Sequence, residues 1–143
     1  MNQINFFSED TDFELSHKEI ISSWIIHTIT TENHELSELN YIFCSDEYLL
    51  QINVDYLQHD YYTDVITFDN SEEESVIEGD IFISIDRISD YAQDQGIAFE
   101  TELRRVIIHG VLHLVGYNDK TDDEQEEMTE KENAYLSLPQ FQI

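Results

Sequence analysis

A ten-residue segment in the C-terminal third of this chain is almost entirely apolar and carries two histidines one helical turn apart. Residues 106–115 are large and apolar except for His109, Gly110 and His113, a composition that predicts a helix buried on nearly all sides. Side chains at positions i and i+4 of a helix project from one face, about 6 Å apart along the axis. The two imidazoles are therefore placed to bind one metal ion, which would also give these buried polar rings their partners.

The residues after this helix can complete such a site. Gly116 can end the helix in a left-handed cap that turns the chain back, so that Asp119 supplies a third ligand. A carboxylate is an ordinary zinc ligand at about 2.0–2.2 Å. We therefore expect one divalent metal ion, zinc in the first instance, at His109, His113 and Asp119. On spacing alone the alternative stays open that the histidine pair binds no metal and is exposed on a helix or hydrogen-bonded in the core.

The spacing H-x-x-x-H-x-x-G-x-x-D is the metzincin ligand string H-E-x-x-H-x-x-G-x-x-H with two substitutions. Gly110 replaces the glutamate that acts as general base in those proteases, and Asp119 replaces the third histidine. The ligand set is retained, but peptide hydrolysis loses its usual proton acceptor. A glycine also destabilises a helix by about 1 kcal/mol relative to alanine, which indicates a close approach of backbone or substrate at this position.

Four strings follow one another along the chain in a recognisable order. YTDVITF occupies residues 62–68, EGDIFI residues 78–83 and HGVLHLVGYND residues 109–119, and Met128 and Glu132 then form M-x-x-x-E. They are similar to P-T-D-V-L-S-F, L-G-D-I-x-I, H-G-x-L-H-L-x-G-Y-D-H and M-x-x-x-E of the YbeY family, bacterial rRNA maturation factors. The resemblance covers about four fifths of the chain.

This resemblance implies a zinc-dependent endoribonuclease specific for single strands, acting in rRNA maturation at the 3′ end of 16S rRNA and in ribosome quality control. His109, His113 and Asp119 would then be catalytic residues as well as metal ligands. The implied partners are rRNA and the small ribosomal subunit. Two other functions stay open: a non-catalytic ribosome-assembly factor with a structural metal, and a metzincin-like metalloprotease.

The chain departs from the family pattern at three positions. Asp119 stands where the family has a third histidine, which leaves the metal preference open. Leu57 follows Tyr56 at a position where many members have an arginine that engages RNA. The absence of this arginine weakens the inference of nuclease activity. Tyr62 replaces a proline, a change that we expect to alter only the stiffness of the loop.

Five residues are candidates for substrate binding. Thr63 and Asp64 should border the metal cleft, because the two strongest motifs of the family are expected to converge there. Arg104 and Arg105 precede the histidine pair by about one turn and could hold a phosphate together with the metal, or simply pair with carboxylates. His59 lies in the loop that leads to Thr63 and could contact the substrate.

Charge limits the kind of RNA binding that can be expected. The chain has 32 acidic and 6 basic residues, a net charge of −26 that argues against broad affinity for nucleic acid. The Debye length is about 8 Å at physiological ionic strength, so the local field at the site decides whether RNA can bind there. An acidic surface would also suit basic ribosomal proteins, through which the chain could dock on a ribosomal particle.

The remaining composition predicts a single domain over residues 1–143 that is soluble and cytoplasmic. Cys44 is the only cysteine, which excludes an internal disulfide. No apolar stretch approaches the roughly 18 residues of a membrane span, and we expect no membrane partner.

The pattern of the chain predicts an α+β fold, with a small mixed β-sheet packed with about five helices and the metal site at the end of a buried helix. Strands are expected at residues 4–7, 13–15, 39–44, 65–68 and 80–85. Helices are expected from a capping box at Ser16 to Ile29, at residues 46–57, from a cap at Asp86 to residue 95, at residues 98–115, and from a capping box at Thr121 onward.

Overall fold

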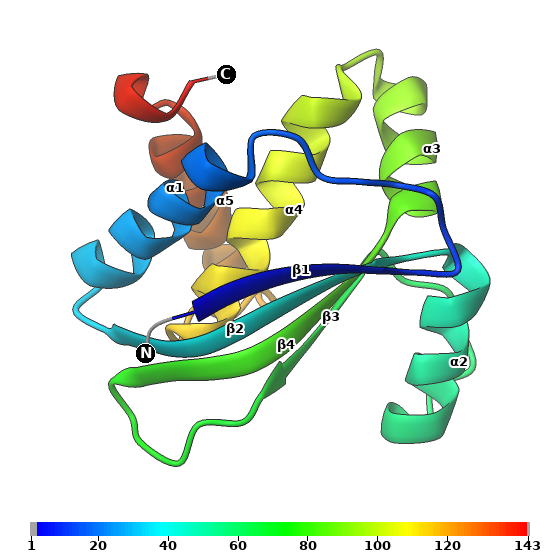
Figure 1. The fold of residues 1–143 in the computed structure, drawn as a ribbon, viewed down its shortest axis with the longest axis horizontal. Helices are drawn as coiled ribbons and strands as arrows, with labels where there is room; N and C mark the ends of the chain where they lie inside the picture. Colours follow the sequence, from blue (N-terminus) through cyan, green and yellow to red (C-terminus); the bar gives the residue numbers. More distant parts are fainter. Residues whose placement is uncertain (1–2, 143) are drawn as a thin grey trace.

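A computed structural model describes residues 3–142 of the chain; residues 1, 2 and 143, which the predicted domain includes, lie outside the described part. Its centre is a four-stranded sheet in the order β1-β2-β4-β3 (Figure 1). The strands are β1 (Gln3–Glu9), β2 (Glu35–Cys44), β3 (Val65–Asp69) and β4 (Val76–Ser84). β1, β2 and β4 are parallel, and β3 is antiparallel to β4. The predicted α+β class with a mixed sheet is confirmed.

Within residues 3–142, five α-helices pack around the sheet. They are α1 (Lys18–Thr31), α2 (Asp46–Leu57), α3 (Ile85–Gln95), α4 (Phe99–Leu114) and α5 (Asp122–Leu136), followed by a short 3-10 turn at Pro139–Phe141. α1, α4 and α5 gather on one face of the sheet, whereas α2 packs against the opposite face (Figure 1). No helix among the described residues is both long enough and apolar enough to cross a membrane.

The main core lies between the sheet and α4. Side chains alternate along β2 and β4, so that one face of the sheet presents a continuous apolar surface to the helices. The fully buried members of this surface include Leu39, Tyr41, Phe43, Ile77, Ile81 and Ile83. A smaller cluster around Leu49 joins α2 to the opposite face of the sheet, where it meets Phe82.

Gly110 allows α4 to approach the sheet closely. A Cβ atom built at this position would lie 2.9 Å from Cδ1 of Ile81 on β4. The close packing of α4 on the sheet therefore explains the glycine. It is the close backbone approach that a glycine in a buried helix indicated. A side chain at position 110 would therefore point toward β4.

Two expectations for the N-terminal segment were wrong in detail. Residues 13–15 form no strand, because Phe13 is held by ring contacts with Phe43 and Phe99 rather than by a ladder of hydrogen bonds. Ser16 opens no capping box: α1 begins at Lys18, after His17, whose left-handed backbone (φ 60°) gives no side-chain cap.

The cap of α3 is Ser84 and not Asp86. The Asp86 carboxylate instead accepts a hydrogen bond from the backbone N–H of Asp46, at 2.8 Å. At α5 the predicted capping box is confirmed, with reciprocal bonds between Thr121 and Glu124.

Candidate metal centre

Three side chains converge at the C-terminal end of α4. Nε2 of His109 and Nε2 of His113 lie 3.0 Å apart. Oδ2 of Asp119 lies 3.3 Å from each of them. Ligand atoms around a tetrahedral zinc ion with bonds of about 2.0–2.1 Å lie about 3.3 Å from one another. Within residues 3–142, these three form the one group of histidine, cysteine or acidic side chains close enough to hold a metal ion.

The turn after α4 brings Asp119 to the histidines. Gly116 has a positive φ of 116°, and the backbone N–H of Tyr117 donates to the carbonyl of Leu112 at 3.0 Å. This is a helix end closed by a glycine, as the sequence predicted. It reverses the chain within a few residues, and Asp119 consequently faces the helix it follows.

The outer nitrogen of each histidine ring, Nδ1, has a hydrogen-bond acceptor. Nδ1 of His109 donates to the Glu132 carboxylate at 2.7 Å, and Nδ1 of His113 donates to the carbonyl oxygen of Tyr117 at 3.0 Å. When both rings are neutral, these bonds place the two Nε2 lone pairs opposite each other. Lone pairs at this distance repel unless a cation lies between them. The donor set therefore fits a divalent metal ion.

Glu132 on α5 connects His109 to Arg105. Its other carboxylate oxygen accepts from Arg105 at 2.8 Å, and Arg105 also donates to Asn133 at 2.8 Å. Burial raises the pKa of Glu132, but the hydrogen bonds from His109 and Arg105 outweigh it and hold the pKa below its usual value. Burial lowers the pKa of His109, but Glu132 and Asp119 reverse this effect, so the pKa lies above its ordinary value.

A second carboxylate, the partly buried Glu32 at the end of α1, anchors the loop that carries Asp119. It accepts hydrogen bonds from Tyr135, from Tyr117 at 2.7 Å and from Lys131 at 3.3 Å. Burial alone would raise the pKa of Glu32, but these donors lower it below its usual value. Because the Tyr117 carbonyl also orients His113, this network helps to hold one candidate ligand in place.

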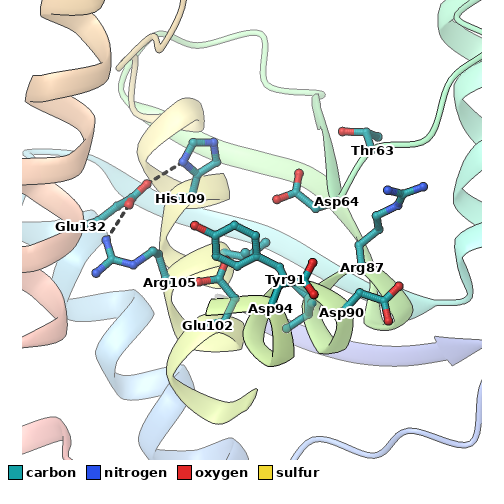
Figure 2. A pocket seen from close by; sticks show the side chains of 12 residues that line it. Thr63, Asp64, Arg87, Asp90, Tyr91, Asp94, Glu102, Arg105, His109 and Glu132 are labelled. Atoms are coloured by element: carbon teal, nitrogen blue, oxygen red, sulfur yellow. Dashed lines mark hydrogen bonds and ion pairs between the residues drawn. The ribbon is translucent and has the colours of Figure 1, made fainter. Parts of the chain in front are cut away.

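A cavity of about 530 Å³ opens beside His109 (Figure 2). Thr63 and Asp64, just before β3, line it together with Arg105 and Glu132. The structure thus brings the T-D motif and the first histidine of the H-x-x-x-H motif to one cavity. Helix α3 supplies the opposite wall, through Arg87, Ile88, Asp90, Tyr91 and Asp94.

Two candidate residues are not brought to this cavity. Arg104 is buried on another side of α4, where its guanidinium lies over the Trp24 ring at 4.4 Å and donates to the Phe141 carbonyl at 3.0 Å. Consecutive helical residues point about 100° apart, and of the two arginines only Arg105 lines the cavity beside His109. His59 stacks on Tyr61, with ring centroids 5.1 Å apart, and does not line the cavity.

Sequence reasoning placed Glu132 in a motif without a role and did not identify Glu32. Only the fold brings these carboxylates, 23 and 85 positions from their partners, to the metal-site residues. The motif M-x-x-x-E was the one available signal for Glu132.

The mixed sheet, the buried helix and the His–His–Asp cluster define a small α+β domain with one group of side chains, among residues 3–142, that could hold a metal ion. Residues 3–139 match the family model described as "Endoribonuclease YbeY". The chain belongs to this family.

Individual relatives agree with the family model. Proteins named "Endoribonuclease YbeY" from Cytophaga hutchinsonii and Amoebophilus asiaticus are 57% and 53% identical to this chain. The alignments cover 96% of this chain and 96% of the first relative, and 93% and 90% for the second. The solution structure of TM1509 from Thermotoga maritima has a TM-score of 0.66 at 27% identity, covering 94% of this chain and 87% of that chain.

Proposed function

We propose that this protein is a zinc-dependent endoribonuclease that cleaves single-stranded RNA in the cytoplasm, in the maturation of rRNA at the 3′ end of 16S rRNA and in ribosome quality control. The convergence of His109, His113 and Asp119 beside a cavity is the observation that carries the proposal. The names of relatives up to 57% identical over 96% of the chain supply the reaction class.

The bound ion would polarise a phosphoryl oxygen and lower the pKa of an attacking water molecule. The protein's part is to hold its ligands. Glu132 and the Tyr117 carbonyl keep a proton on Nδ1 of each histidine, which leaves Nε2 free as the ligand atom. Asp64 is exposed and lines the same cavity, and we assign it the role of accepting a proton from the water.

The cavity carries few positive charges for an RNA phosphate. Arg87 and Arg105 line it, and each is already paired with a carboxylate, Asp46 or Glu132. With Leu57 in place of the family arginine, the metal ion itself would be the main attraction for the scissile phosphate. The proposal therefore implies modest affinity for RNA and a strong dependence on the metal.

The metalloprotease alternative is disfavoured by the direction of residue 110. Position 110 points at Ile81 in the sheet, so no side chain there can act as a base in the cavity. The assembly-factor alternative has specific support in the net charge of −26 and in Leu57. It predicts binding to a ribosomal particle without cleavage.

The test uses metal-free protein reloaded with zinc and an end-labelled single-stranded RNA. We expect cleavage that a chelator abolishes, that added zinc restores and that Asp119→Ala lowers by at least about 100-fold. Asp12→Ala, which removes one exposed carboxylate from the loop after β1, is the matched control and should cleave as the parent does. Zinc-loaded protein that binds ribosomal particles but cleaves no RNA would favour the assembly factor instead.

A further inference from the structure

Glu102 is a largely buried acidic residue whose carboxylate has no hydrogen-bond or ion-pair partner among residues 3–142. It lies on α4, two turns before His109, and only 7% of its surface is exposed. It lines the cavity beside the metal centre, and among residues 3–142 no hydrogen bond or ion pair to its side chain is present. The two arginines of the cavity, Arg87 and Arg105, are both paired with other carboxylates.

The environment of Glu102 favours a ligand that donates hydrogen bonds. Burial raises the pKa of Glu102, the charge of Arg105 lowers it, and the charges of Asp64 and Glu132 raise it further, so that the pKa lies above its usual value. An ionised carboxylate offers acceptor sites only. Within residues 3–142 the one fully buried side-chain nitrogen or oxygen without a partner is Nε of Arg104, so the unpaired Glu102 oxygens are open to the cavity, where a bound molecule can supply donors.

The other residues that line the cavity limit the shape and charge of the molecule that can bind there. Ile88 and Val106 give apolar wall, and the ring of Tyr91 is 51% exposed at the opening (Figure 2). Asp90 and Asp94 add negative charge, which excludes a phosphate from this part of the cavity. A flat, uncharged group with N–H donors on one edge satisfies these conditions. An unstacked nucleobase has this chemistry, and RNA-binding proteins read such bases by stacking on aromatic rings and hydrogen bonding to their edges.

The bases differ in the donors that they offer to one carboxylate. Guanine presents N1–H and the N2 amino group side by side, which matches two carboxylate oxygens. Adenine and cytosine place an acceptor beside their amino group, and uracil has a single N–H between two carbonyls. Only guanine gives two donors to one ionised carboxylate.

We infer that this cavity is a subsite for an unpaired guanine of the RNA, read by Glu102, while a neighbouring phosphate lies at the metal centre. This inference rests on the proposed function, since His109 lines the same cavity and a strand at the metal would place an adjacent base there. A basic peptide chain could also meet the carboxylates, but it would not need the apolar wall or the exposed ring.

The experiment measures stopped-flow fluorescence anisotropy with zinc-loaded protein and single-stranded RNA heptamers, so that binding is read before cleavage. One heptamer carries a single central guanine; the others replace it with adenine, cytosine, uracil or inosine, which lacks the N2 amino group. We expect the guanine heptamer to bind about tenfold more tightly than the adenine one, with inosine between them. Glu102→Gln should reduce this ratio to below about twofold, because an amide offers only one acceptor.

Glu100→Gln, at an exposed position on the same helix, is the charge-matched control and should keep the preference. Equal binding of all heptamers, or a preference that survives Glu102→Gln, would overturn the inference. So would Glu102-dependent binding of an oligoarginine peptide without base preference, which would assign the cavity to a basic chain. Chelator-sensitive cleavage of guanine-free RNA by the zinc-loaded parent separates the two proposals, because it supports the nuclease whether or not the guanine subsite exists.

Discussion

The Glu132 carboxylate lies 2.7 Å from Nδ1 of His109, although the two residues belong to different helices. This bond sets the proton on the outer nitrogen of the ring and aims the inner nitrogen at His113 and Asp119. Carboxylate–histidine–metal arrangements of this kind tune metal affinity without direct contact between the carboxylate and the ion.

Replacing Glu132 by glutamine should weaken zinc binding by about 10–100-fold. The amide carries no charge, so His109 becomes less basic, and the ion pair with Arg105 is lost as well. Competition with a zinc-binding dye measures the affinity. Glu130→Gln, an exposed change on the same helix, should leave it unaltered; equal losses in the two variants would mean that general charge and not the bond to His109 is responsible.

Asp119→His should retain zinc and shift hydrolysis to lower pH. A neutral imidazole in place of a carboxylate leaves more positive charge at the metal, which strengthens its effect on a water molecule. The pH–rate profile of RNA cleavage by the two proteins checks this expectation. A rising limb at the same or at higher pH in the variant would be evidence against Asp119 as a ligand.

Gly110→Glu should unfold the protein and should not create a protease. The added Cβ would meet Ile81 at 2.9 Å, and the carboxylate would be buried between α4 and β4 at an expected loss of about 4 kcal/mol or more in the free energy of unfolding. Gly110→Ala should lose only up to about 2 kcal/mol, since better helix propensity offsets part of the overpacking. Urea unfolding measures both, and a folded Gly110→Glu protein with peptidase activity would show that residue 110 faces the cavity.

Glu102→Gln should stabilise the free protein at neutral pH. The pKa of Glu102 in the folded state lies above its ordinary value of 4.5, so the folded state is favoured when this group is protonated and loses stability as the pH rises through that range. Glutamine cannot ionise and avoids this loss. Unfolding at about pH 7 should therefore show a more stable variant, and the difference should shrink toward about pH 4. A variant less stable at pH 7 would indicate that the Glu102 carboxylate has a partner in the folded protein.

The strongest parts of the fold were predictable because their signals are local. The apolar run around His109 predicted a helix at residues 98–115, and α4 spans Phe99–Leu114. Thr121 and Glu124 determine the start of α5 through their own side chains. The segment around Phe13 was mistaken for a strand because its apolar residues serve contacts with distant rings, and periodicity does not distinguish those contacts from a ladder.

The residues of the candidate site also differ in how far local sequence could predict them. His109, His113 and Asp119 lie within eleven residues, so helix geometry and one turn suffice to bring them together. Glu132 and Glu32 have no such local relation to the metal, and their positions depend on how α5 and α1 pack against α4. Glu102 lies on α4 itself, two turns before His109, but the cavity that it lines exists only because α3 forms the opposite wall. Arg104 and Arg105 were treated as a pair from sequence proximity, yet the helix directs one into the core beside Trp24 and the other to Glu132.

The most direct measurement is a titration of metal-free protein with zinc while the cleavage rate of a single-stranded RNA is followed. If His109, His113 and Asp119 hold one catalytic ion, the rate should rise in proportion to added zinc and level off at one equivalent, and Asp119→Ala should show no such rise. Cleavage at full rate before zinc is added, or one equivalent of tightly bound zinc without any cleavage, would contradict a metal-dependent ribonuclease at this site.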